Sequence, residues 1–216
     1  MNSNRSALIV VDMQHYFVEP QSSLMTLVES LQPGSVTPYV ERVRETVIPA
    51  IQRLLHSFRA LKSPIFFTEF ASHTSDGSDL PLWARRINDL AFSTIETIAY
   101  PAFDDSSASI IPALLPESGE LVLQKTTAGT LSSTDLNTHL SNLEVSSVVV
   151  CGVNTDVCVG QTARELADRG YDVVLVEDGC ATLSPDAHLA TLESFGVIFG
   201  QARSADEIIG ELAGAT

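Results

Sequence analysis

Cys158 has the side chain with the most distinctive chemistry in this chain of 216 residues. It lies in the run 151–158, between an apolar strand expected over 147–150 and an amphipathic helix expected over 155–168. Thr155 is a good N-cap, so Cys158 falls in the first helical turn, where backbone N–H groups and the helix dipole stabilise anions. We therefore expect a lowered pKa and a nucleophilic thiolate, with an oxyanion bound by the same turn. For this motif alone, the alternative is a buried structural cysteine.

Two charged residues follow other apolar strands. Asp12 comes directly after 7–11, and Lys125 comes directly after 121–124. Ligands of an open α/β sheet bind outside the carboxyl ends of its strands, so an acid, a base and a thiol each leave a strand at that edge. Asp12 alone could cap a helix or a turn, and Lys125 alone reads as a solvated lysine. Their joint placement with Cys158 is what indicates a site.

Strand-like and helix-like segments alternate along the chain. Apolar runs predict strands near 7–11, 64–67, 121–123, 148–150, 173–176 and 197–199. Helical patterns cover 38–61, 132–142, 155–168, 184–195 and 204–212, with a kink or break expected at Pro49. The alternation predicts an α/β fold with a three-layer, Rossmann-like, doubly wound, mostly parallel six-stranded sheet and helices on both faces. In the usual strand order the strands of Asp12 and Cys158 are neighbours, and the strand of Lys125 lies further away.

Composition narrows the class of protein. The length suits a single domain over 1–216, and 44% hydrophobic residues argue against disorder. A net charge of −15 disfavours nucleic acids and anionic membranes as partners and is otherwise typical of an acidic, soluble surface.

Cysteine usage and the first residues bear on the compartment. Three cysteines do not suggest a disulfide framework; we expect Cys151 in the core and Cys180 in the core or a loop. The apolar run 6–11 is too short for a signal peptide or a membrane span, so the expected location is the cytoplasm.

Four motifs together resemble a known family. The run 10–17 (VVDMQHYF) looks like the opening motif of the isochorismatase-like cysteine hydrolases, and Lys125 after 119–124 matches the family's lysine. The run 151–159 (CGVNTDVCV) followed by Thr162-Ala163 matches its cysteine motif, and the segment 170–181 with His188 also fits. The resemblance extends from about Ser6 to the last strand. The family includes nicotinamidases, N-carbamoylsarcosine amidohydrolases and ureidoacrylate amidohydrolases.

The resemblance implies a mechanism and an assembly. Asp12, Lys125 and Cys158 would meet as a catalytic triad, with Asp12 accepting the thiol proton and Lys125 orienting Asp12. The backbone N–H groups of Asn154 and Cys158 would bind the oxyanion, and a cis peptide at Val153–Asn154 would aim the first of them. A thioester on Cys158 would then be hydrolysed by water. No cofactor is expected, and a homodimer or homotetramer would complete the pocket.

Substrate and metal predictions rest on fewer residues. Gln14, Phe17 and Trp83 are the candidate pocket residues; His15 fits a pocket or the surface equally. Nicotinamidases carry an Asp-x-His metal site in the loop after the second strand, and this chain has none there. Glu69 and His73 alone make a poor metal site, so we expect no catalytic metal. Nicotinamidase activity is therefore a less favoured prediction than hydrolysis of another small amide. The favoured substrate is a small amide, ureido or carbamoyl compound.

Two other functions stay open at this stage. One is an isochorismatase-type vinyl-ether hydrolase, which needs acid catalysis but no nucleophile, so retention of Cys158 favours amide hydrolysis. The other is a non-catalytic binding module on the same fold. Thiol alkylation is the discriminating test, because a reactive thiol with a low pKa fits only the nucleophile interpretation.

Overall fold

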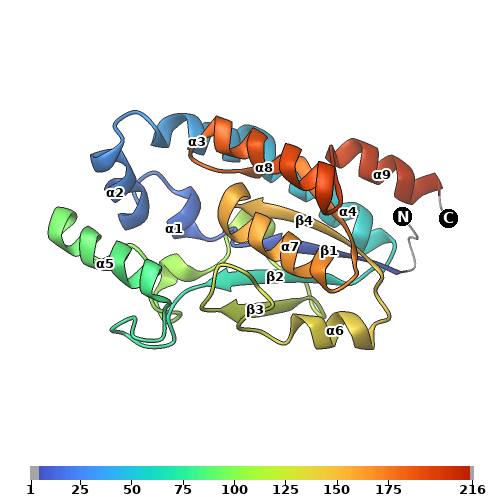
Figure 1. Ribbon diagram of the computed structural model, residues 1–216, viewed down its shortest axis with the longest axis horizontal. Coiled ribbons are helices and arrows are strands. Elements are labelled where there is room, and N and C mark those ends of the chain that lie inside the picture. Colours follow the sequence, from blue (N-terminus) through green and yellow to red (C-terminus); the bar gives the residue numbers. More distant parts are fainter. Residues whose placement is uncertain (1–4, 215–216) are drawn as a thin grey trace.

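A parallel sheet of six strands forms the centre of the computed structural model, which describes residues 5–214 (Figure 1). The strands are β1 (Ser6–Val11), β2 (Ile65–Phe70), β3 (Leu121–Lys125), β4 (Ser147–Val153), β5 (Asp172–Ala181) and β6 (Gln201–Arg203). Their order is β3-β2-β1-β4-β5-β6, and every pairing is parallel. This confirms the predicted doubly wound fold, with β1 and β4 as neighbours at the switch point.

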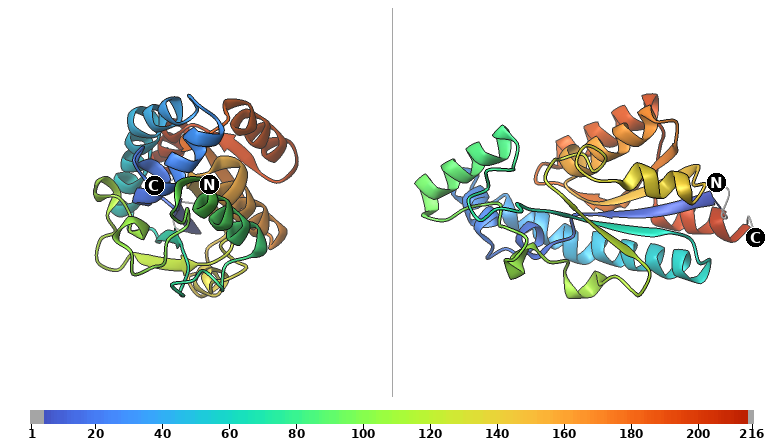
Figure 2. Two further views of the ribbon diagram at one scale, coloured as in Figure 1. Left: turned by 90° about the vertical axis from the view of Figure 1, so that its left-hand side faces the viewer. Right: turned by 90° about the horizontal axis from the view of Figure 1, so that it is seen from below.

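Helices cover both faces of the sheet. They are α1 (His15–Val18), α2 (Ser23–Leu31), α3 (Val36–Arg42), α4 (Ile48–Ala60), α5 (Leu82–Ile95), α6 (Leu136–Asn142), α7 (Gly160–Asp168), α8 (Pro185–Ile198) and α9 (Ala205–Gly214). Short π-helical and 3₁₀ segments are η2 (Val43–Val47), η3 (Ser106–Ala108), η4 (Pro112–Leu114) and η5 (Thr155–Val159). Figure 2 shows α4 and α9 on one face and α6, α7 and α8 on the other. No helix within 5–214 is both long and apolar enough to cross a membrane.

The two central strands are buried along their whole length. Each residue of β1 and of β4 is buried, as expected for parallel strands covered on both faces. Gly152 pairs with Val11 and has a φ of +117°. A Cβ at Gly152 would lie 2.0 Å from the Val11 carbonyl oxygen, so only glycine allows β1 and β4 to approach just before the site.

Two sequence predictions need correction. The strand predicted over 197–199 is wrong: these residues end α8 and follow it, and the sixth strand is β6. A short apolar run does not separate a helix end from a strand, and Val197 is 79% exposed. The long helix passes Pro49 without a break, as α3, η2 and α4 in succession. Pro49 has no N–H for the carbonyl four residues earlier, and the wider π turn η2 lies over that position.

Helix α5 was not predicted at all. It lies at the carboxyl-end side of the sheet and packs against α2 (Figure 1). Its buried residues are Ala84 and Ala91, which are too small to give a strong periodic apolar signal. The apolar periodicity of the sequence therefore does not predict the helix that carries Trp83.

Candidate active site

Asp12 directly follows β1 and lies at the carboxyl-end edge of the sheet. Its φ of +52° is a left-handed conformation that non-glycine residues seldom adopt and that recurs at functional sites. The carboxylate is fully buried. Thr68 donates its hydroxyl to Asp12 Oδ1 at 2.5 Å, and Lys125 Nζ lies 2.8 Å from Oδ2. Both oxygens of the buried acid therefore face a donor.

Lys125 crosses the width of one strand to reach Asp12. It pairs with Phe70 of β2, and its Nζ lies 4.8 Å from the centre of the Phe70 ring. The ammonium also donates to the carbonyl oxygens of Thr127 (3.0 Å) and Ala128 (3.1 Å). Burial by itself lowers the pKa of Lys125, but the adjacent Asp12 carboxylate outweighs it, with Cys158 acting in the same direction, and the pKa is raised. Lys125 is thus a buried cation.

Cys158 lies in η5, directly after β4, and is 2% exposed. Its thiol lies close enough to Asp12 and Lys125 for both side chains to shift its pKa. The structure therefore brings together the three residues predicted from the sequence. It does not support the expected lowering of the thiol pKa: burial raises the pKa of Cys158, Lys125 lowers it and Asp12 raises it, for a net increase.

The charges of the three side chains explain why the pKa of Cys158 is raised. With Asp12 and Lys125 charged and the thiol neutral, the three side chains carry no net charge. A thiolate would add an uncompensated negative charge in a buried environment, which is unfavourable in free energy. Transfer of the thiol proton to Asp12 keeps the total at zero, so the thiolate forms most readily by that route.

This charge balance predicts the pH dependence of thiol alkylation. With a raised pKa, only a small fraction of Cys158 is thiolate at pH 7, and this fraction grows about tenfold per pH unit below the pKa. Iodoacetamide labelling followed by mass spectrometry should therefore accelerate continuously from pH 7 to 9.5. A rate that levels off with a midpoint below pH 7 would contradict the charge count. Cys158→Ala is the control, because Cys151 and Cys180 are both 0% exposed.

The turn between β4 and Cys158 has the form that the family resemblance implies. The Val153–Asn154 peptide bond is cis, as expected. The Asn154 carbonyl accepts hydrogen bonds from the N–H groups of Val157 and Val159, each at 3.1 Å. The chain thus turns tightly around Asn154 before entering α7.

Gln14 does not have the predicted pocket role. Its carboxamide accepts from the Phe70 N–H at 2.8 Å and donates to the carbonyl oxygens of Phe70 (3.1 Å) and Ala108 (2.5 Å). Both ends of this fully buried amide are used by the main chain. Gln14 therefore ties the segment after β1 to β2 and η3 and is not free to bind a substrate.

Phe17 and Trp83 belong to one aromatic cluster beside Lys125. Its members are Tyr16, Phe17, Phe70, Trp83 and Tyr100. Trp83 stacks on Phe70 with ring centres 5.7 Å apart. Phe70 in turn contacts the ammonium group of Lys125, so it connects Trp83 to Lys125. Trp83 is 36% exposed, whereas Phe17 is 2% exposed. Of the two predicted pocket aromatics, Trp83 is the one that reaches the surface.

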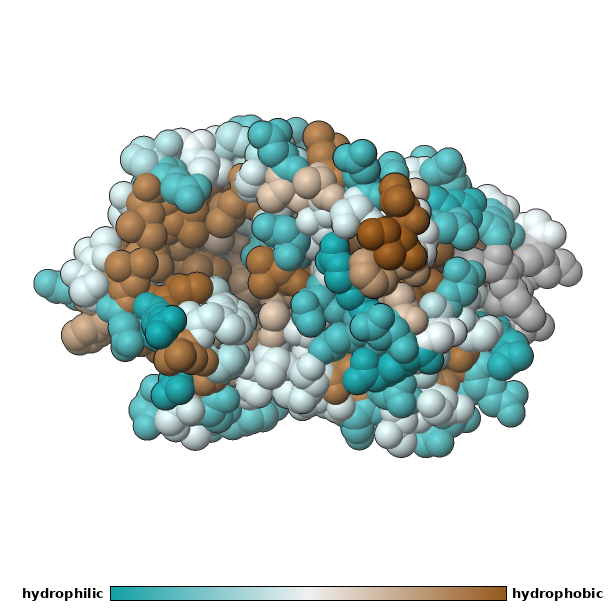
Figure 3. Space-filling view, in the orientation of Figure 1, coloured by the Kyte–Doolittle hydropathy of each residue, from teal (hydrophilic) through white to brown (hydrophobic). Residues whose placement is uncertain are grey.

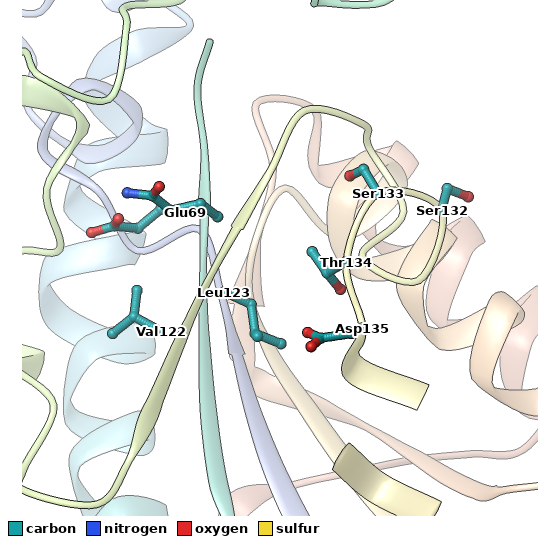
Figure 4. A pocket seen from close by; sticks show the side chains of 8 residues that line it. Glu69, Val122, Leu123, Ser132, Ser133, Thr134 and Asp135 are labelled. Atoms are coloured by element: carbon teal, nitrogen blue, oxygen red, sulfur yellow. The ribbon is translucent and has the colours of Figure 1, made fainter. Parts of the chain in front are cut away.

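Glu69 and His73 do not form a joint site. Glu69 lines an open pocket beside the edge strand β3, and its carboxylate points away from Thr134 and Asp135, which line the same pocket (Figure 4). Burial raises the pKa of Glu69, and hydrogen bonds from Gln124 and the Ile110 backbone oppose the increase. The His73 ring instead lies 4.6 Å from the Phe103 ring. Among residues 5–214, no group of three or more His, Cys, Asp or Glu side chains could hold a metal ion. His15 pairs with Glu19 at 2.6 Å, near the surface.

Two partners of the site were missed by the sequence analysis. Thr68 holds Asp12, and Tyr100 packs edge-on against Trp83 at 5.8 Å. Thr68 pairs with Val11 in the sheet, so its position follows from the register of β1 and β2. No pattern in the sequence marks Tyr100, which lies in irregular chain after α5.

Comparisons with known proteins identify the family of this chain. Residues 6–207 match the Isochorismatase domain family. The chain is 25% identical over 210 residues to N-carbamoylsarcosine amidase of Arthrobacter sp, covering 95% of this chain and 70% of that protein. It is 27% identical over 215 residues to nicotinamidase 3 of Arabidopsis thaliana, covering 99% and 91%. A cysteine hydrolase from Pseudomonas syringae pv. phaseolicola 1448A has a crystal structure that matches with a TM-score of 0.79 and 27% identity, covering 100% and 96%. Because the family match spans nearly all of the described residues, the chain belongs to the isochorismatase family of hydrolases.

Proposed function

We propose that this protein is a cysteine hydrolase that cleaves a C–N bond of a small amide, ureido or carbamoyl compound. The single observation that carries the proposal is the buried thiol of Cys158 in contact with the Asp12–Lys125 ion pair. A buried acid, base and thiol cost stability, and such groups cluster where they perform chemistry.

The proposed reaction begins with proton transfer. Asp12 accepts the thiol proton of Cys158, and Lys125 keeps the carboxylate oriented through the 2.8 Å ion pair. The sulfur attacks the substrate carbonyl carbon, and the N–H groups of Asn154 and Cys158 bind the resulting oxyanion. Asp12 then gives the proton to the departing nitrogen, which leaves a thioester. Water hydrolyses the thioester and releases the acid product.

The surroundings of Asp12, Lys125 and Cys158 suit a small substrate with apolar parts. Apolar residues line a hollow between α2 and α5, at the carboxyl-end side of the sheet (Figure 3). Trp83 of α5 is partly exposed, and its contact with Phe70 leads towards Lys125. Lys125 is occupied by Asp12 and two carbonyl groups, so it is poorly placed to bind an anionic substrate. The names of the relatives, an N-carbamoylsarcosine amidase and a nicotinamidase, support C–N bond hydrolysis. A metal-free site, a cytoplasmic location and a homodimer or homotetramer stay predictions.

A substrate panel tests the proposed activity. Purified protein is incubated with primary amides, ureido acids, N-carbamoyl amino acids and isochorismate, and both ammonia and pyruvate are measured. Ammonia from at least one C–N substrate is expected, with loss of the signal in Asp12→Asn. Pyruvate from isochorismate, at a rate that Cys158→Ala does not change, would instead establish the vinyl-ether hydrolase. No product from any compound would favour the binding module.

A further inference from the structure

A chain of hydrogen bonds reaches the turn of Cys158 from α8 and the end of α3. His188 of α8 is 7% exposed, and its Nδ1 lies 2.9 Å from the hydroxyl of Thr155, the first residue of η5. Its Nε2 lies 3.1 Å from the guanidinium of Arg42 at the end of α3. Thr155 is fully buried and lies three residues before Cys158. None of these groups has a part in the proposed reaction steps.

The hydrogen-bond partners of His188 determine which ring nitrogen carries the proton. A guanidinium has only N–H donors, so Nε2 must accept from Arg42 and the ring proton must be on Nδ1. Nδ1 therefore donates to the Thr155 oxygen. Arg42 is itself fixed by donation to the carbonyl oxygens of Cys180 (3.2 and 3.1 Å) and Glu177 (3.0 Å). Burial, with the nearby charge of Arg42, lowers the pKa of His188 to about 4, against the opposing charge of Asp156, so the neutral ring persists at neutral pH.

A second hydrogen bond holds the adjacent residue of the same turn. Thr182, just after β5, donates its hydroxyl to Asp156 Oδ1 at 2.6 Å. Two consecutive residues before the nucleophile are therefore attached to elements outside the turn. Asn154 and Cys158, which frame these two residues, would supply the oxyanion-binding N–H groups, so small shifts of the turn would misplace both the thiol and its donors.

We infer that His188 is a positioning residue that acts through the Thr155 hydroxyl to fix the turn carrying Cys158. The inference rests on the proposed function, because it assigns the histidine a part in that same site. It does not require knowledge of the substrate, since the position of the thiol has a readout of its own.

Two matched pairs of variants test the inference. Thr155→Ser keeps the hydroxyl and Thr155→Val removes it at nearly constant volume. His188→Asn places an N–H near the Nδ1 position, and His188→Gln places its amide near Nε2 instead. We expect kcat to fall about 10- to 100-fold in Thr155→Val and His188→Gln, with KM within about threefold of wild type. Thr155→Ser and His188→Asn should recover most of the lost kcat. The exposed His56→Gln serves as the control for histidine replacement.

Iodoacetamide labelling of Cys158 at pH 8 provides the second readout. A turn that is held less firmly exposes the buried thiol more often, so Thr155→Val and His188→Gln should be labelled at least about fivefold faster than wild type. If His188 and Thr155 only stabilised the fold, the same variants would have a lower melting temperature. They would not combine a lower kcat with faster labelling of Cys158. Wild-type kcat and labelling in folded Thr155→Val would overturn the inference. If no C–N substrate is hydrolysed at all, the proposed function fails, and labelling alone decides whether His188 positions the turn.

Discussion

Cys158→Ala is expected to lose at least about 10⁴-fold in kcat/KM for the C–N substrate, since removal of a covalent nucleophile disables the whole triad. The substitution leaves the Asp12–Lys125 ion pair intact, because the thiol is neutral in the resting site. The folded structure should therefore persist, with a loss of about 1 kcal/mol that is ordinary for a buried substitution. Ammonia release measures the activity, and chemical denaturation measures the stability.

Cys151→Ala is the matched control for that experiment. Cys151 is as deeply buried as Cys158, but its thiol contacts the Ile9 carbonyl oxygen in the core of the sheet. This variant should keep activity within about threefold while losing a similar amount of stability. Activity in Cys158→Ala within tenfold of wild type would show that the thiol is not the nucleophile.

Lys125→Met should lower the free energy of unfolding by about 3–5 kcal/mol, because it leaves the fully buried Asp12 carboxylate without its cation. Asp12→Asn should cost a similar amount, since it leaves the buried ammonium without its anion. The double variant removes both charges and should lose much less than the sum of the two single losses. Urea unfolding of the four proteins gives the coupling free energy directly. Activity should also fall in all three variants, as each removes proton transfer or its orientation.

The surface of the same protein offers a control for this cycle. Arg53 pairs with Asp178 and Asp206 at 3.3 and 3.2 Å, and its side chain is 45% exposed. Arg53→Met should change the unfolding free energy by less than about 1 kcal/mol, because solvent screens an exposed ion pair. Additive losses in the Asp12/Lys125 cycle would mean that the two groups are not coupled, and the triad would then lack its electrostatic basis.

Sequence patterns predicted the positions of the reactive residues better than their chemistry. Asp12 and Cys158 follow fully buried strands, so their meeting at one edge follows from the sheet topology. Lys125 lies two strands from Asp12, and only the three-dimensional structure shows that its extended side chain bridges β2. The pKa of Cys158 was predicted with the wrong sign, because helix position is visible in sequence whereas burial and the local charge count are not.

The surroundings of Asp12, Lys125 and Cys158 were the least predictable part of the molecule. Gln14 and Phe17 stand beside Asp12 in sequence, yet the Gln14 amide is consumed by backbone groups and Phe17 packs into the core. Trp83 was identified only as an aromatic residue, and its partner Tyr100 lies in chain without regular structure. Such contacts depend on how long connections fold, which periodicity does not describe.

Intact mass spectrometry decides whether Cys158 forms a covalent acyl intermediate. Wild-type protein and Cys158→Ala would be mixed with the amide, ureido and carbamoyl panel and quenched in acid within seconds. The predicted result is an adduct with the mass of the acyl group on wild type only, mapped to Cys158 and accompanied by ammonia. Ammonia release without any adduct, at equal rates in both proteins, would show that hydrolysis does not pass through Cys158.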